Sequence, residues 1–235
     1  MYTLFAETKD FFYGLLKAFI QSGGADEPSL EQYFEALEAV EAAGLLTSEN
    51  SKQNLTWARE WDASLGQFSA WMAPSGCYLG GMFALTADVL KRSSMDFANV
   101  STASIRHPDR LMQLAKDITQ TCTLAANRTS TGLLPQGPFF PEMDYRSESG
   151  DNGSSFNLNS DLAESYLLLW RTTTEESYRD AAWQQVQALE RLFLTKSEML
   201  SKNASLEVDQ NSNNETSSPS TQSIASPLFL SATLK

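Results

Sequence analysis

The sequence predicts an all-α fold built from antiparallel helix pairs. Three observations favour it: apolar residues recur at helical spacing in several long segments, glycines and prolines separate these segments, and no strand-rich run or strand–helix alternation occurs. The chain has 235 residues with 42% hydrophobic content, which is enough for one domain with a sizeable core.

The first two helices are predicted from their apolar faces. A helical apolar pattern covers residues 5–20, and Gly23 and Gly24 stop it. Pro28 then opens a second helix, whose apolar residues keep a period near 3.6 as far as Leu45. The pattern is weaker over residues 55–71 and indicates turns or short strands.

Glycines surround Cys77 at the entrance of an apolar helix that extends to Val89. Glycine at such a position indicates that another part of the chain approaches the backbone closely. These glycines are Gly76, Gly80 and Gly81. Residues 92–107 are polar and irregular, which indicates a surface insertion, and Pro108 starts the next helix.

Residues 159–173 place two carboxylates one helical turn apart. Ser160 is a candidate N-cap, and Asp161 and Glu164 follow in the first turn of the predicted helix. A further helix is predicted over residues 175–194. Acids in a first turn also stabilise the helix dipole, so this spacing leaves a chemical and a structural role both open.

The remaining polar segments contain no pattern that predicts a metal site or a catalytic triad. Residues 197–226 are rich in Ser, Asn, Thr and Glu and are predicted to be disordered. The acidic loop over residues 142–151 fits no EF-hand spacing and is predicted to be solvated. His107 is the single histidine, which argues against a zinc site and against a Ser-His triad elsewhere.

The charge balance limits the class of partner. The chain has 29 acidic and 17 basic residues, a net charge of -12, which disfavours nucleic acid and anionic membranes and suits a neutral ligand such as a glycan. No run reaches about 18 apolar residues, and no signal peptide is evident. The chain is therefore expected to be a piece of a longer one or to stay in the cytosol.

The cysteines and asparagines bear on the compartment. Cys77 and Cys122 are as compatible with free buried thiols as with a bridge. Six asparagines begin Asn-x-Ser/Thr triplets, which indicates the secretory lumen and would permit a bridge. These are Asn54, Asn99, Asn127, Asn152, Asn203 and Asn214.

The segment over residues 158–183 resembles a motif of the glycosyl hydrolase family 47 α-1,2-mannosidases. That motif begins Leu-Arg-Pro-Glu-x-x-Glu-Ser and continues to Tyr-Arg-x-x-x-Trp. The matching positions include Leu158, Asp161, Glu164, Ser165, Arg171, Tyr178, Arg179 and Trp183. Five more segments are similar to family motifs in the same order: DFFYGLLKAFIQSGG, SLEQYFEALEAV, GQFSAWMAPSGCYLGGMFAL, TCTLAANRTSTGLLPQ and SPLFLSATLK. The most similar subgroup is the endoplasmic reticulum type that trims Man9 glycans.

The resemblance implies an (α/α)7 barrel with a disulfide between Cys77 and Cys122. It also implies a Ca²⁺ ion at the barrel floor and inverting hydrolysis, in which two carboxyl groups act as acid and base. The implied partners are high-mannose N-glycans in the endoplasmic reticulum or Golgi lumen, where full-length family members are membrane-associated.

Site roles follow from the matched positions. Asp161 corresponds to the catalytic base, and Glu164 and Arg171 correspond to substrate-binding residues. An ungapped alignment places Lys9 where the family has a catalytic aspartate, whereas a one-residue deletion would make Asp10 that aspartate. A shift of one residue turns a helical side chain by about 100°, so the two alignments point in different directions.

The resemblance also implies that the chain corresponds to part of a catalytic domain. It places the general-acid glutamate before Met1 and the calcium-binding threonine after Lys235. Within 1–235, the expected parts are a helical part over 1–196, a low-complexity loop over 197–226 and a truncated last motif over 227–235.

Three further departures affect polar positions of the family. Pro74 replaces a histidine, and Gln136 and Ala232 each replace a glutamate. Two functions therefore remain open. One is a mannosyl-oligosaccharide 1,2-α-mannosidase, and the other is a catalytically inactive mannosidase-like module that binds glycans or glycoproteins in endoplasmic reticulum quality control.

Overall fold

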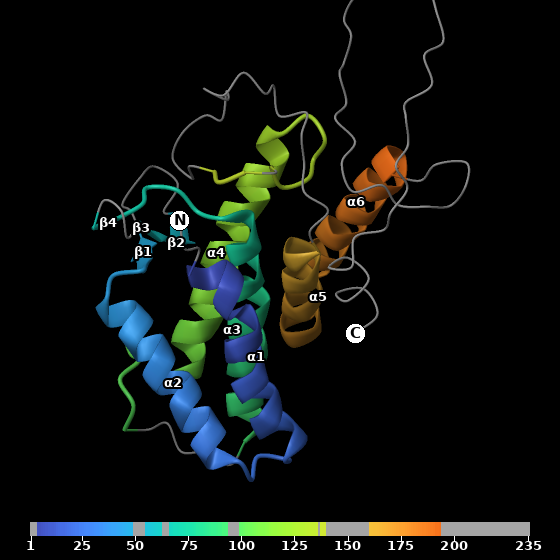
Figure 1. Ribbon diagram of the computed structural model, residues 1–235. Helices are drawn as coiled ribbons and strands as arrows, with labels where there is room; N and C mark the ends of the chain where they lie inside the picture. Colours follow the sequence, from blue (N-terminus) through green and yellow to red (C-terminus); the bar gives the residue numbers. More distant parts are fainter. Residues whose placement is uncertain are drawn as a thin grey trace, which may run out of the picture.

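The computed structural model describes residues 4–48, 55–62, 66–93, 99–135, 137–139 and 160–193. This part of the chain is mainly helical, which confirms the all-α prediction, and its helices pair in chain order (Figure 1). The three pairs are α1 (Leu4–Gln21) with α2 (Glu27–Ala42), α3 (Tyr78–Arg92) with α4 (Pro108–Arg128), and α5 (Asp161–Thr173) with α6 (Glu176–Phe193).

The helices form two layers with the core between them. α3 contacts both α1 and α5, so these three helices form one layer, and α2, α4 and α6 contact them in turn. The buried Tyr33 of α2 packs edge-to-face against Phe12 of α1, and its hydroxyl lies 2.8 Å from the Thr86 hydroxyl of α3. α2 therefore joins α1 to α3, as expected for one arc of an α/α barrel.

The turn between α1 and α2 follows from the local sequence. Gly23 and Gly24 both have positive φ, and the Gly24 N–H donates to the Phe19 carbonyl, which ends α1. Asp26 is the N-cap of α2, and its carboxylate accepts a hydrogen bond from the Ser29 N–H. Both predicted helices are confirmed, but α2 ends at Ala42, three residues before the predicted end at Leu45.

Short strands lie between α2 and α3. β1 (Leu46–Ser48) pairs antiparallel with β2 (Thr56–Ala58), and β3 (Trp61–Asp62) pairs antiparallel with β4 (Gln67–Phe68). The Thr121 hydroxyl donates to the Thr56 carbonyl and ties β2 to α4. The short strands predicted over 55–71 are confirmed, whereas β1 was not predicted because three residues carry no readable period.

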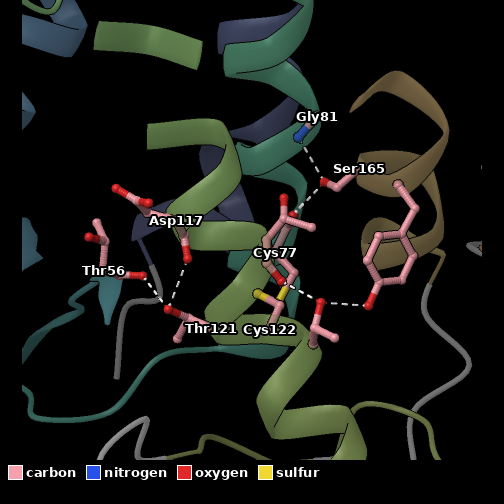
Figure 2. Close-up of a disulfide and its surroundings, with 10 residues drawn as sticks. Thr56, Cys77, Gly81, Asp117, Thr121, Cys122 and Ser165 are labelled. Carbon is pink, nitrogen blue, oxygen red and sulfur yellow. Dashed lines mark hydrogen bonds between the residues drawn. A yellow bond between two sulfur atoms is a disulfide. The ribbon is translucent and has the colours of Figure 1, made fainter. Parts of the chain in front are cut away.

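A disulfide joins the start of α3 to the C-terminal part of α4. Cys77 closes the short 3-10 helix η1 (Pro74–Cys77), and it is bonded to Cys122 of α4, with both residues fully buried. Beside it, the buried Ser165 hydroxyl of α5 donates to the Cys77 carbonyl and accepts from the Gly81 N–H, as Figure 2 shows. The disulfide implied by the resemblance is confirmed, and one hydroxyl links α5 to it.

The glycines of α3 allow helices to pack closely. A Cβ atom at Gly80 would lie 2.1 Å from Thr119 Oγ1 of α4, and one at Gly81 would lie 3.0 Å from the Ser165 Cα of α5. Real Cβ atoms essentially never approach another heavy atom to 2.1 Å. The close backbone approach predicted for this helix entrance is therefore confirmed.

The α5–α6 pair departs from its prediction at two residues. Ser160 occupies the N-cap position, but its side chain makes no capping hydrogen bond in the described structure. α5 ends at Thr173, its C-cap Thr174 has a left-handed φ of 60°, and α6 begins at Glu176 rather than Glu175.

Of the predicted insertion over 92–107, Arg92 is the last residue of α3, and residues 99–107 are anchored to α2. Ile105 is fully buried, and Arg106 forms ion pairs with Glu31 and Glu38. This segment is therefore held to the core at its C-terminal end and is not wholly a surface loop. The predictions for residues 142–151, Gln136, 197–226 and 227–235, including Ala232, lie outside the described residues.

Candidate functional site

An ion-pair cluster joins the first turn of α5 to α1. Lys9 Nζ of α1 is hydrogen-bonded to Asp161, and it lies 3.3 Å from Glu164 Oε2. The Asp161 side chain is 12% exposed and that of Glu164 is 35% exposed. The two predicted carboxylates therefore converge, but on a lysine ammonium.

Two aromatic rings flank the Lys9 ammonium. Nζ lies 5.4 Å from the ring centroid of Tyr78, the first residue of α3, and 5.7 Å from that of Tyr13 on α1. Cation–π attraction acts at such distances and adds to the two ion pairs. α1, α3 and α5 thus each contribute a side chain to one cluster, which consists of Lys9, Tyr13, Tyr78, Asp161 and Glu164.

Burial and charge set the ionisation of the cluster. Burial acts to lower the pKa of the Lys9 ammonium, but the charges and hydrogen bonds of Asp161 and Glu164 outweigh it and raise that pKa above 10.5. Burial, followed by the Glu164 and Asp161 charges, raises the pKa of the Tyr13 phenol well above its usual value. At neutral pH the site contains an ammonium and neutral phenols.

Asp10 and Arg171 lie apart from this cluster. Asp10 is exposed, and Lys9 is the residue that faces Asp161, which is the arrangement of the ungapped alignment. Arg171 is an exposed residue in the last turn of α5. It comes ten residues after Asp161, which corresponds to about 15 Å along the helix axis, so the two side chains start from opposite ends of α5.

A buried glutamate near the cluster was missed by sequence reasoning. Glu60, between β2 and β3, is 2% exposed, and its charge adds to burial in raising the pKa of the Tyr78 phenol. It lies in the weakly patterned segment over residues 55–71. No local pattern in that segment indicated its burial.

His107, the single histidine, has a structural role at the start of α4. The His107 Nδ1 accepts a hydrogen bond from the Asp109 N–H and caps the start of α4. No group of three or more His, Cys, Asp or Glu side chains that could hold a metal ion occurs in the described ranges. Within this part of the chain, the two central carboxylates, Asp161 and Glu164, are bound by Lys9.

Replacing Lys9 with methionine is expected to lower the free energy of unfolding by about 2 kcal/mol near neutral pH, because two partly buried carboxylates lose their counter-ion. The folded pKa of Lys9 is raised, so its contribution is complete below about pH 10.5 and disappears as pH rises through the folded value. Urea denaturation from about pH 8 to pH 12 measures this difference. Lys9→Arg keeps the charge and is the control. A difference that does not shrink at alkaline pH would contradict the ionic origin.

The fold and the site together define a class of protein, an α/α barrel with carboxylates at the start of an inner helix. Residues 2–235 match glycosyl hydrolase family 47, and the chain belongs to this family. The chain is 31% identical, over 77% of its length, to mannosyl-oligosaccharide alpha-1,2-mannosidase IA of Spodoptera frugiperda. It is 30% identical, over 81% of its length, to the endoplasmic reticulum mannosyl-oligosaccharide 1,2-alpha-mannosidase of Homo sapiens.

A solved structure shows the same fold. The α-1,2-mannosidase from Trichoderma reesei, an (α/α)7 barrel, matches with a TM-score of 0.62 over 83% of this chain and 40% of that chain, at 15% sequence identity. The chain covers 24% and 25% of the two sequence relatives and therefore spans about a quarter of their length. None of the described helices is long and apolar enough to cross a membrane.

Proposed function

We propose that this chain is part of a protein that acts on α-1,2-linked mannose in high-mannose N-glycans, with mannosyl-oligosaccharide 1,2-α-mannosidase as its reaction class. The observation that carries this proposal is the family match over residues 2–235, together with relatives that are named as mannosidases of this specificity. The net charge of -12 is compatible with a neutral glycan and unfavourable for nucleic acid.

In this proposal Asp161 is the residue placed to act as the general base. An inverting glycosidase needs a carboxylate that activates water on one face of the sugar and a carboxylic acid on the other. Asp161 is the more buried of the two acids in the cluster, and Glu164 lies one turn further along α5, where it can accept hydrogen bonds from sugar hydroxyls. The acid would come from outside the described residues. Asp10 and Arg171 would contribute only if their exposed side chains turned towards the sugar.

A second function is favoured by Lys9, namely glycan binding without hydrolysis. A base must be free to take a proton from water, and Asp161 is instead paired with a lysine whose pKa is raised. An ammonium next to two carboxylates can still donate hydrogen bonds to sugar oxygens. For this chain by itself, we therefore infer recognition of mannose-terminated glycans without cleavage.

Calorimetric titration of the chain with a Man9 glycan, with and without calcium and alongside a free-mannose assay, tests both functions. The expected result is a binding isotherm with no mannose release, and loss of binding in Asp161→Ala. Release of mannose would exclude the binding-only function and establish hydrolysis. Absence of both signals, from a chain that unfolds cooperatively, would contradict glycan recognition by this chain.

The proposed location is the lumen of the secretory pathway, either the endoplasmic reticulum or the Golgi. The buried Cys77–Cys122 disulfide supports an oxidising compartment, because such bonds are rare in the cytosol. The name of the human relative includes the endoplasmic reticulum. Immunofluorescence of the full-length protein, with organelle markers, tests this location.

A further inference from the structure

Two of the six Asn-x-Ser/Thr triplets begin in the described residues, and their settings differ. Asn99 begins a triplet that ends at Ser101, in an exposed turn before α4. Asn127 begins a triplet that ends at Thr129, in the last turn of α4 and its C-cap. Both asparagines are exposed, so exposure alone does not distinguish them.

The hydroxyl groups of the two triplets have different partners. The exposed Ser101 Oγ accepts a hydrogen bond from the Ala103 N–H at 3.3 Å, which leaves its own proton available. The half-buried Thr129 Oγ1 lies 2.7 Å from the Ala126 carbonyl oxygen and 2.8 Å from that of Leu133, which accept its proton. Within the described residues, the Thr129 hydroxyl therefore donates its proton to carbonyl oxygens, whereas the Ser101 hydroxyl only accepts.

Backbone geometry adds a second difference. A glycosyltransferase that recognises the triplet must reach the asparagine amide and the hydroxyl two residues later at the same time. In an α-helix, residues two apart are rotated by about 200° and do not face each other. Asn127 has helical geometry, whereas Asn99 lies in a turn that imposes no such separation.

We propose that Asn99 is an N-glycosylation site that stays open in the folded protein, whereas folding of α4 closes the Asn127 triplet. The donor class is a lipid-linked oligosaccharide pyrophosphate. The Asn99 amide nitrogen forms a bond to C1 of the first sugar, the C1–O bond breaks, the lipid pyrophosphate leaves with the electron pair, and the amide loses one proton. The product is a neutral N-glycosidic amide on the protein surface.

Formation of the Cys77–Cys122 disulfide affects when Asn127 can be glycosylated. Cys122 lies five residues before Asn127 in α4, and its bond to Cys77 holds that helix against η1. Once the bond has formed, α4 is constrained and the Asn127 triplet is held in helical form. Asn127 is thus a substrate only before α4 folds, and removal of the bond prolongs that interval.

The test is expression of the full chain, behind a cleavable signal peptide, in eukaryotic secretory cells. Peptide mass spectrometry after glycan release in ¹⁸O-water measures the occupancy of each asparagine. The expected occupancy of Asn99 is roughly five-fold that of Asn127. In Cys77→Ser, the occupancy of Asn127 is expected to rise about three-fold while that of Asn99 is unchanged.

Two variants at Ser101 are matched controls. Ser101→Ala removes the hydroxyl and is expected to abolish occupancy of Asn99, and Ser101→Thr is expected to keep it. Equal occupancy of Asn99 and Asn127 in the wild type would overturn the proposal, as would an unmodified Asn99. Neither result would bear on mannose recognition, which the calorimetric titration measures separately.

Discussion

The double substitution Cys77→Ala/Cys122→Ala is expected to lower the free energy of unfolding by about 4 kcal/mol. The bond joins residues that are 45 apart in sequence, and opening a loop of that length restores conformational entropy to the unfolded chain. The bond connects η1 to α4 next to the start of α3, where the Ser165 hydroxyl donates to the Cys77 carbonyl. Urea denaturation of the oxidised wild type and the variant measures the difference.

The wild type in reductant provides the control for this experiment. After its bond is reduced under mild denaturation and the chain is refolded, it should have the stability of the double variant, and the variant itself should not respond to reductant. A loss below about 1 kcal/mol would mean that the bond contributes little constraint and that helix packing alone holds η1 to α4.

Gly80→Ala is expected to destabilise the fold by about 3 kcal/mol, because the added methyl group would overlap Thr119 Oγ1 of α4. The Ala115 carbonyl oxygen of α4 would lie only 3.2 Å from the new Cβ, so the added methyl group would face backbone of α4 as well as the Thr119 side chain. α3 and α4 would have to separate. Thermal and urea unfolding measure this effect, and the exposed Gly14 of α1, whose Cβ would meet nothing within 4 Å, provides Gly14→Ala as a matched control.

A second substitution separates the clash from other causes. Thr119 Oγ1 is buried without a hydrogen-bond partner in the described structure, so Thr119→Ala removes the overlapping atom and breaks no hydrogen bond of that hydroxyl. Gly80→Ala/Thr119→Ala should therefore regain at least about half of the lost stability. Strictly additive effects of the two substitutions would show that the overlap is not the source of the loss.

Much of the helical arrangement could be predicted from local sequence. The apolar period of 3.6 identified the helices, and glycine or proline near their ends placed most boundaries, as at Gly23, Gly24 and Pro108. The start of α6 was misplaced by one residue because Thr174, a residue with no sequence signal for left-handed backbone, adopts positive φ. Boundaries of this kind depend on how two helices pack and not on their own residues.

The candidate site was predicted in part. The spacing of Asp161 and Glu164 placed them on one side of α5, and the structure brings both to the same cluster. The spacing did not identify their partner, because Lys9 lies more than 150 residues earlier in the chain. Glu60, which is 2% exposed, was also missed, because the segment around it has no clear apolar period.

The sequence by itself determined the helical fold class, the family and the two cysteines and two carboxylates around which the inner helices are arranged. Tertiary structure alone decided that Lys9 faces Asp161 and that Asp10 is exposed. The physical reason is the rotation of side chains around the helix axis. The side chains of adjacent helical residues point about 100° apart, and the packing of α1 against α3 sets whether Lys9 or Asp10 points inwards. The charge at the centre of the site, and with it the expected chemistry, depends on that rotation.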